Sequence, residues 1–252
     1  MLIIGTDKSP ILSHLPESFL FIDDGPLIDA ITLPKRRKVT QLDFSKHSFN
    51  PLKGMDYQKA RQFITDLDAV FPEGANTLTK KNSNFILLNA LLEKPTTLDA
   101  LLSQSKDPAQ QDAYQKIQTL LLSPILKKVL CGPNNFTFKG ILIARLDRAR
   151  MGDFDCFVLG NLLISQYPGT VVVPDFGFYA SPNHIQLMRQ QRLIAGLSTL
   201  DEVPRPIAQQ LLLMRPLLGR RSTFDDAETL AAYAGIPKHI NAYSDFIEEA
   251  MR

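Results

Sequence analysis

The sequence is poor in the residues that mark several classes of protein. Its 252 residues include no tryptophan and only two cysteines, and the formal net charge is +2. Cys131 and Cys156 have no CxxC partner or neighbouring histidine, so the sequence predicts neither a disulfide framework nor a zinc site and favours a reducing compartment. The four histidines are isolated and no Gly-x-Ser-x-Gly motif occurs, which leaves metal-bound and serine-hydrolase chemistry without support.

Long apolar runs are also missing. No apolar stretch approaches the roughly 18 to 20 residues that cross a bilayer. The start, Met1-Leu2-Ile3-Ile4, has no basic residue and no cleavage site, so we expect no signal peptide, no membrane insertion and a cytoplasmic location. The small net charge means that any DNA contact must come from local patches.

With 44% hydrophobic residues, the composition is that of a globular protein. Short apolar runs predict strands at 2–4, 19–22, 39–44, 140–144, 170–173 and 194–199. Helical spacing covers 57–70, 84–92, 98–102, 112–130 with a break at Ser123-Pro124, 157–164, 184–193, 207–214 and a capped helix from Asp225. We therefore predict an α/β protein with the first part of its core at 1–54, an all-helical insertion at 55–130, and the remainder of the core with C-terminal helices at 131–252.

The segment after the first expected strand contains the residue types of a phosphate-binding loop. It reads Gly5-Thr6-Asp7-Lys8-Ser9. In such loops glycine lets backbone N–H groups approach the phosphates, lysine neutralises them, and a serine or threonine hydroxyl reaches magnesium. The segment is short and has Asp7 where a glycine is expected, so a polar turn after an edge strand is the alternative interpretation.

Further motifs follow along the chain. Phe21-Ile22-Asp23-Asp24-Gly25 is a strand that ends in an acidic turn, and Ser48-Phe49-Asn50-Pro51-Leu52 comes next. After the helical stretch, Val171-Val172-Val173-Pro174-Asp175 is a second strand that ends in an acid. Gln190-Gln191-Arg192-Leu193-Ile194-Ala195-Gly196 then leads from a helix into a strand that ends at Ser198-Thr199.

In this order the motifs resemble those of FtsK/HerA/TraG-type P-loop ATPases, and the resemblance covers most of the chain. It implies a P-loop NTPase (RecA-like) core sheet flanked by helices, and it implies ATP and Mg as ligands. The residues that it assigns to the nucleotide are Gly5, Thr6, Lys8 and Ser9. Ser9 and Asp175 would hold magnesium, Asp175 would also orient the attacking water, and Arg192 would act in a neighbouring subunit's site.

The chain departs from the family pattern at two further places. Pro174 stands where the first of two acids is usual, and Ser198-Thr199 occupy the place of a glutamine. The simpler interpretations are that Asp175 belongs to a Pro-Asp turn after a buried strand, and that Arg192 is a cation at a helix C-terminus.

A basic cluster follows the strand expected at 140–144. Arg145, Arg148 and Arg150 lie just past the strand's end, where α/β proteins bind ligands, so they are candidates for contact with nucleic acid or for action in a neighbouring subunit's site. No aromatic residue is interleaved with them, and a solvated surface is the alternative.

The resemblance implies a homo-oligomer, or an assembly with partner ATPase subunits, that acts on DNA in translocation, transfer or packaging. The altered motifs favour a second hypothesis, in which the chain is a pseudo-ATPase with a structural or regulatory role in such an assembly. A third hypothesis is an α/β protein that binds a small molecule.

Overall fold

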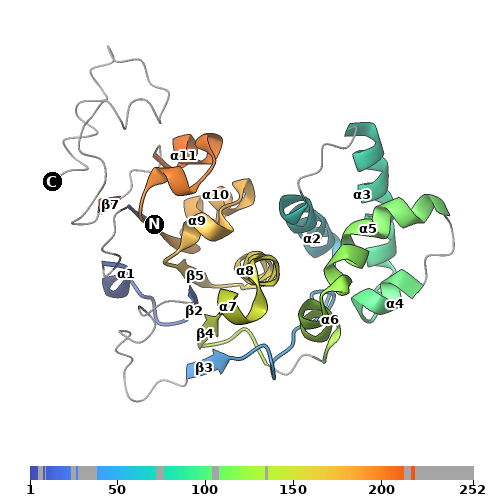
Figure 1. The fold of residues 1–252 in the computed structure, drawn as a ribbon, viewed down its shortest axis with the longest axis horizontal. Coiled ribbons are helices and arrows are strands. Elements are labelled where there is room, and N and C mark those ends of the chain that lie inside the picture. The colour runs from blue at the N-terminus through green and yellow to red at the C-terminus, as the bar shows by residue number, and fades with distance from the viewer. Residues whose placement is uncertain are drawn as a thin grey trace, which may run out of the picture. The chain divides into compact units, whose positions relative to one another are not determined.

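A computed structural model of the chain describes residues 1–4, 8, 10–23, 27, 39–71, 77–103, 108–133, 136–212 and 217–218. The chain divides into two compact units. Residues 1–41, 139–146 and 167–252 form an α/β unit, and residues 42–138 and 147–166 form a helical unit (Figure 1). Among the described residues, no helix is long and apolar enough to span a bilayer.

The α/β unit is built on one seven-stranded sheet with the order β3-β4-β2-β5-β6-β1-β7. The strands are β1 (Leu2–Ile4), β2 (Phe19–Asp23), β3 (Val39–Leu42), β4 (Ile141–Arg145), β5 (Thr170–Val173), β6 (Leu193–Leu197) and β7 (Leu217–Leu218). Every neighbouring pair from β4 through to β7 is parallel. The strands expected from apolar runs all form, with ends that differ by a few residues.

The central strands are buried on both faces, as is usual for parallel strands. All five residues of β2 and all five of β6 are buried. Alternate strand residues form one core cluster with Ile11 of α1 (Pro10–Ser13); its other members are Ile3, Phe19, Phe21, Ile141, Ile143, Val172 and Ile194.

Further helices of this unit follow β5 and β6. They are α9 (Phe176–Tyr179), α10 (Pro182–Arg189), the 3₁₀ turn η2 (Leu200–Glu202) and α11 (Arg205–Leu212). α9 and α10 contact β6, and α11 contacts α10. The helix expected from Asp225 lies outside the described residues.

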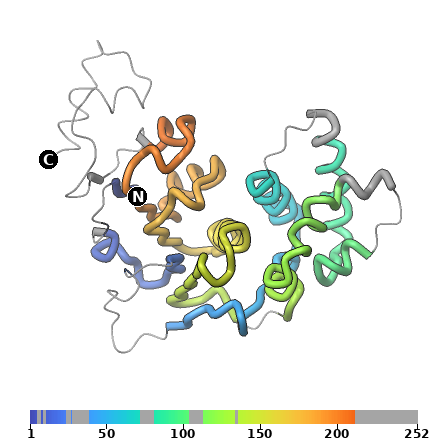
Figure 2. The backbone as a smooth tube through the Cα atoms, viewed as in Figure 1, coloured from blue at the N-terminus to red at the C-terminus, as the bar shows by residue number. Residues whose placement is uncertain are grey.

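The helical unit consists of α2 (Tyr57–Val70), α3 (Thr77–Leu92), α4 (Leu98–Ser103), α5 (Pro108–Leu122), α6 (Pro124–Cys131), α7 (Arg148–Met151) and α8 (Asp153–Gln166). α2 packs against α3 and α8, while α5 packs against α3, α4 and α6. Figure 2 follows the chain from β3 through α2 to α6 and on to β4, after which come α7 and α8. The compact unit thus takes in more of the chain than the predicted insertion at 55–130.

Local capping explains where the helices begin and break. Asp56 Oδ1 accepts a hydrogen bond from Lys59 N at 2.9 Å and so caps α2. Ser123 Oγ accepts from Leu126 N at 3.2 Å, and Pro124 occupies the first turn of α6. A serine cap followed by proline is a strong helix start, which is why the expected helix over 112–130 is broken at this point.

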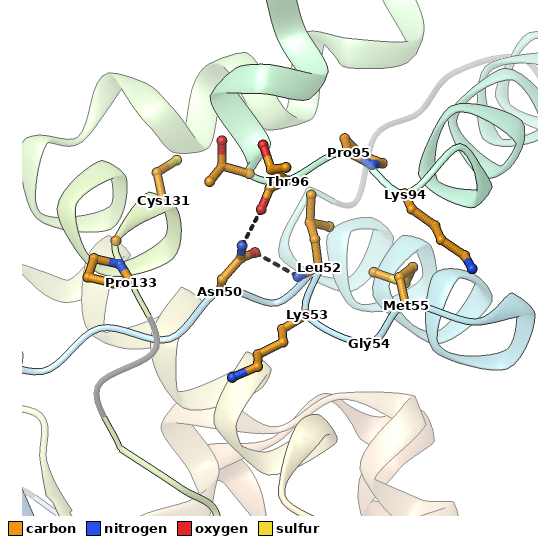
Figure 3. Close-up of a pocket in the computed structure, with 12 residues that line it drawn as sticks. Asn50, Leu52, Lys53, Gly54, Met55, Lys94, Pro95, Thr96, Cys131 and Pro133 are labelled. Atoms are coloured by element: carbon orange, nitrogen blue, oxygen red, sulfur yellow. Dashed lines mark hydrogen bonds between the residues drawn. The ribbon is translucent and has the colours of Figure 1, made fainter.

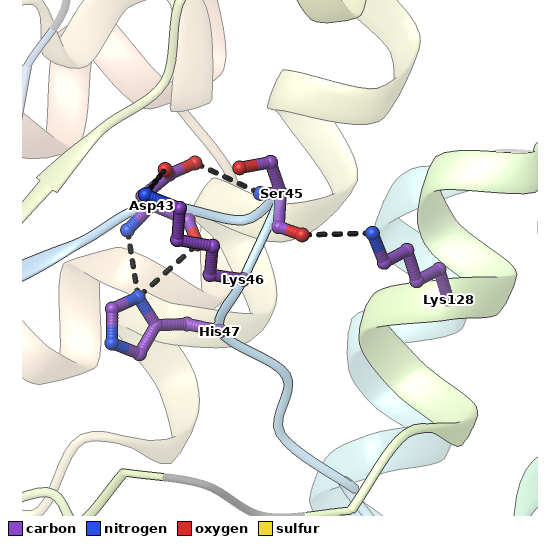
Figure 4. Close-up of polar contacts among 5 residues, drawn as sticks. All are labelled: Asp43, Ser45, Lys46, His47 and Lys128. Carbon is purple, nitrogen blue, oxygen red and sulfur yellow. Dashed lines mark hydrogen bonds and ion pairs between the residues drawn. The ribbon is translucent and has the colours of Figure 1, made fainter.

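A polar turn marks the entry to the helical unit after β3. Asp43 Oδ1 accepts from Ser45 N, and His47 Nδ1 accepts from Asp43 N, each at 2.9 Å (Figure 4). The hydrogen bonds from Ser45 hold the pKa of Asp43 below its usual value. Lys128 of α6 donates to Ser45 O at 2.7 Å, which ties the turn to the helices. The strand expected at 39–44 ends at Leu42, because residues 43 and 44 belong to this turn.

Candidate functional site

The carboxyl ends of β1, β5 and β6 meet at one edge of the sheet. The register pairs Ile4 with Leu197 and Val173 with Ala195. In parallel α/β sheets, ligands bind in the crevice outside the carboxyl ends of the strands. Lys8, Asp175 and Ser198 follow these three strand ends, so the fold brings segments far apart in sequence to the same edge.

Lys8 and Asp175 are in direct contact at this edge. Lys8 Nζ donates to Asp175 Oδ1 and forms an ion pair between residues 167 positions apart. The Lys8 side chain is 13% exposed and that of Asp175 is 48% exposed. A lysine this buried requires a partner, because an unpaired ammonium group in the interior is strongly destabilising. The structure thus joins the residue predicted to hold phosphate and the residue predicted to orient water.

Gly196 explains how the turn that carries Asp175 can lie so close to β6. A Cβ atom at this glycine would lie 2.5 Å from Pro174 O and 3.2 Å from Ile11 Cδ1. Contact with a backbone oxygen at that distance cannot be relieved by a side-chain movement. The absence of a side chain at Gly196 therefore sets the position of the Pro174-Asp175 turn.

A second carboxylate lies at this edge of the sheet. Ser198 N donates to Glu202 Oε1 at 3.1 Å and to Oε2 at 3.2 Å, just beyond the end of β6. A Cβ atom at Gly177 would lie 2.6 Å from Glu202 Cβ, so Glu202 also packs against the start of α9. Sequence reasoning missed Glu202. The signal was the Thr199-x-x-Glu202 spacing, which is that of a capping box.

Arg192 lies at the opposite edge of the sheet. It directly precedes β6, and its carbonyl oxygen accepts from Val171 N at 2.8 Å near the start of β5. Its Nη2 donates to Tyr167 O at 2.6 Å. Within one chain, Arg192 is therefore not brought to Lys8 and Asp175, and its role in a neighbouring subunit stays a prediction.

The three arginines predicted to contact nucleic acid are all exposed. Arg145 is the last residue of β4 and belongs to the α/β unit, whereas Arg148 and Arg150 lie on α7 in the helical unit. Asp147 begins α7, with Oδ1 accepting from Arg150 N at 3.2 Å. Their exposure suits contact with a phosphate backbone and equally suits a solvated surface.

The other predicted nucleotide ligands, Gly5, Thr6 and Ser9, lie outside the described residues. In the part of the chain that the structure describes, no group of three or more His, Cys, Asp or Glu side chains could hold a metal ion. Magnesium in nucleotide sites is bound by one or two carboxylates together with substrate phosphates. Asp175 supplies a ligand of this kind, so the residues present fit magnesium that arrives with a nucleotide.

The helical unit contains a hollow of about 580 Å³ beside the loop that leads into α2. Asn50 Nδ2 donates to Thr96 O, and Asn50 Oδ1 accepts from Leu52 N at 2.9 Å (Figure 3). Cys131 also lines this hollow, and burial raises the pKa of its thiol to about 11. A thiol with such a pKa stays protonated and unreactive. Asn50 of the Phe-Asn-Pro-Leu motif therefore joins two loops of the helical unit.

A second cavity in the helical unit, of about 470 Å³, has Asp66 among its lining residues. Asp66 is 3% exposed, and its Oδ1 accepts from Gln62 Nε2 at 2.8 Å and from Ser165 Oγ at 2.9 Å. Burial raises the pKa of Asp66 to about 7, although these two hydrogen bonds lower it. Sequence reasoning missed this residue. The signal was an acid beside Phe63 and Leu67 on the apolar face of a predicted helix.

His184 is a buried titratable group near the sheet edge. It lies on α10, is 1% exposed, and its ring packs on that of Phe176 with centroids 5.8 Å apart. Burial lowers the pKa of His184 to about 4, and a hydrogen bond to the Tyr179 backbone opposes this shift. A neutral imidazole here supports α9, the helix that starts directly after Asp175.

Comparison with solved structures finds clear likenesses at low sequence identity. VirB4 of Thermoanaerobacter pseudethanolicus matches with a TM-score of 0.56 and 14% identity, covering 94% of this chain and 81% of VirB4. The bacterial conjugative coupling protein TrwBdeltaN70 in its unbound monoclinic form matches with a TM-score of 0.52 and 13% identity, covering 84% of this chain and 66% of the TrwBdeltaN70 chain. The trigonal form of TrwBdeltaN70 in complex with sulphate matches with a TM-score of 0.50 and 13% identity. This match covers 86% of this chain and 68% of that one.

No protein-family model and no curated protein matches the sequence. At these identities the structural likeness shows the fold. The chain has the α/β fold of the P-loop ATPases, with a parallel sheet flanked by helices, and this confirms the fold class predicted from the order of the motifs.

Proposed function

We propose that this chain is a P-loop ATPase-like component of a DNA transfer system, with its nucleotide site at the sheet edge where Lys8 meets Asp175. The observation that carries the proposal is this ion pair, since its two members were assigned to one nucleotide site on separate motifs. The fold shared with VirB4 and with a conjugative coupling protein supports a role in transfer.

In the proposed reaction, Lys8 leaves Asp175 and binds the β- and γ-phosphates of ATP. Asp175, once released, orients a water molecule that attacks the γ-phosphorus and accepts the proton that this water loses. The bond between the γ-phosphorus and the bridging oxygen breaks, and ADP leaves with that oxygen. Magnesium, when bound with the nucleotide, neutralises charge on the phosphate oxygens, with Asp175 and Ser9 as the residues that would hold it.

The assembly proposed with this activity is a homo-oligomer, or a ring with partner ATPase subunits, that handles DNA. Arg192 lies at the edge of the sheet opposite Lys8, and in this proposal it acts in a neighbouring subunit's site. Arg145, Arg148 and Arg150 are exposed and are the proposed contacts to DNA phosphates.

Two observations favour a pseudo-ATPase as the second candidate. Asp175 neutralises Lys8 in the structure, so a nucleotide has to break an ion pair before Lys8 can bind phosphate. Pro174 also leaves the strand with one acid instead of two. In the pseudo-ATPase, these two features lower the rate of ATP hydrolysis and leave the fold intact.

Thermal melting with and without Mg-ATP tests the proposal. At a ligand concentration 100 times the dissociation constant, binding stabilises the native state by about 2.7 kcal/mol. We expect this shift in the wild type, its loss in Lys8→Ala, and its retention without phosphate release in Asp175→Asn. Lys46→Ala, which removes an exposed lysine in the helical unit, is the control and should keep both properties.

The possible outcomes separate the two candidates. ATP-dependent stabilisation with phosphate release in the wild type supports the ATPase, and stabilisation without release supports the pseudo-ATPase. A wild-type chain that Mg-ATP does not stabilise would contradict nucleotide binding at this edge.

A further inference from the structure

Glu202 carries a carboxylate that two elements hold at the carboxyl edge of the sheet. Its Oε1 and Oε2 both accept from Ser198 N, at 3.1 and 3.2 Å, and Ser198 directly follows β6. A Cβ atom at Gly177 of α9 would lie 2.6 Å from Glu202 Cβ and 2.8 Å from its Oε2. The backbone of α9 therefore packs against the carboxylate itself, and these contacts fix the position of the charged group.

This carboxylate lies beside the proposed nucleotide site. Gly177, which it contacts, comes two residues after Asp175 in the segment that follows β5. β6, whose end it contacts through Ser198, lies between β5 and β1 in the sheet, and Lys8 follows β1. Glu202 thus contacts the segments that follow two of the three strands at the edge where Lys8 meets Asp175.

The carboxylate of Glu202 can accept a ligand. An ionised carboxylate has about four lone-pair sites, and the single N–H group of Ser198 uses only part of this capacity. Glu202 is exposed, so a ligand at the edge of the sheet can reach its oxygens. Among the described residues, no lysine or arginine forms an ion pair with it, whereas Asp175 is paired with Lys8.

We infer that Glu202 is the second carboxylate for the magnesium that enters with the nucleotide, in the place that Pro174 leaves open on β5. The inference rests on the proposed nucleotide binding at this edge. Magnesium in nucleotide sites takes one or two carboxylates, and Asp175 is the acid that β5 supplies. Because magnesium keeps several of its waters, Glu202 can act through one of them while it still accepts from Ser198 N.

Binding of ADP with and without magnesium tests this role without any turnover. We expect magnesium to strengthen ADP binding to the wild type, and Glu202→Gln to lower the magnesium affinity of the ADP complex about 10- to 100-fold. Removal of a negative charge should leave ADP in EDTA bound as tightly as in the wild type or more tightly, whereas structural damage would weaken both measurements. Isothermal titration measures ADP binding, and melting temperatures at saturating ADP follow the magnesium titration.

The variants separate the charge of Glu202 from its capping role. Glu202→Gln keeps a side-chain oxygen for Ser198 N, and its melting curve without ligand verifies that it is folded. Gly177→Ala keeps the charge but displaces the carboxylate, because the added Cβ would lie 2.6 Å from Glu202 Cβ. It should also lower the magnesium affinity. Asp201→Asn is the matched control, since Asp201 is the adjacent exposed acid of η2 and its loss removes the same charge.

Loss of the magnesium effect in Glu202→Gln, with its retention in Asp201→Asn, would support the inference. Wild-type magnesium affinity in Glu202→Gln, or an equal loss in Asp201→Asn, would overturn it and leave the nucleotide site standing. If Glu202→Gln does not fold, the magnesium affinity of Gly177→Ala decides in the same way. A wild-type chain that binds no ADP, with or without magnesium, would contradict the proposed function and this inference together.

Discussion

Asp66 and His184 show how burial controls the charge of single residues in this protein. Each is almost fully buried, and in each case burial disfavours the charged form, which raises the pKa of the acid and lowers that of the base. Because the pKa values differ between the folded and unfolded chain, both residues link the stability of their unit to pH.

For Asp66, the folded-state pKa of about 7 lies above the unfolded value of 3.8. The stability that comes from protonating this residue is fully present below the unfolded value and is lost as the pH rises through about 7. We therefore expect Asp66→Asn to stabilise the helical unit near pH 8, by up to about 4 kcal/mol, and to have little effect near pH 4. Urea denaturation at both pH values measures this, with Asp155→Asn as control. A gain of equal size at both pH values would argue against titration of Asp66.

For His184, the folded-state pKa of about 4 lies below the unfolded value of 6.5. The stability contributed by the neutral ring is fully present above 6.5 and is lost as the pH falls through about 4. We expect the α/β unit to lose up to about 3 kcal/mol over this range, and His184→Gln to flatten the dependence. Hydrogen exchange of the amides in α10, recorded at several pH values, measures the stability of the α/β unit. His14→Gln, at an exposed histidine, should leave the pH dependence of this stability unchanged.

At the scale of residues, the sequence identified groups that belong to local motifs and missed those defined by burial. Lys8 and Asp175 follow apolar runs at strand ends, and their positions can be read from the sequence. Asp66 and Glu202 have only weak local signals, because their importance depends on partners from other parts of the chain, Ser165 for the one and Gly177 for the other. Side-chain partners at such separations are not encoded in any local pattern.

Among the elements, β6 has a double role as a core strand and as a support for the Asp175 turn. Gly196→Ala would place a methyl group 2.5 Å from Pro174 O, so the turn has to move. We expect a loss of about 1 to 3 kcal/mol in stability and slower phosphate release from Mg-ATP, because Asp175 moves with Pro174. Chemical denaturation and a phosphate-release assay measure the two effects.

Gly132→Ala is a suitable control for this prediction. A Cβ atom there would lie 2.7 Å from Lys128 O, so the clash with backbone is similar, but it falls in the helical unit. It should destabilise the protein without changing the response to Mg-ATP. If Gly196→Ala behaves in the same way, β6 does not position Asp175.

The boundaries of elements were predictable where capping residues mark them. The Ser123-Pro124 break separates α5 from α6 as expected. By contrast, α3 begins at Thr77, ahead of the apolar spacing that starts at Asn84. Its first turns contain no regular apolar stripe, so periodicity alone could not find them.

At the scale of the whole molecule, the fold class followed from the alternation of strands and helices, while the order of strands did not. The order β3-β4-β2-β5-β6-β1-β7 depends on which strands pair, and the strands other than β3 are all short, mainly apolar runs. The extent of the helical unit was equally hidden, because 147–166 joins it through tertiary contacts of α8 with α2 and α6.

The pairing of β2 with β4 has a consequence for how the chain folds. Ser18 Oγ donates to Gly140 O at 2.8 Å across 122 positions of sequence, next to the start of the paired strands. The entropy lost in closing a loop grows with its length, and contacts between distant residues slow folding. The helices α2 to α6 lie between β3 and β4 in the sequence, and these two strands are neighbours in the sheet. Folding of this helical segment therefore brings β3 and β4 together. We therefore expect formation of the helical segment to influence how fast the sheet assembles, so a substitution that unfolds this segment should slow the pairing of β3 with β4.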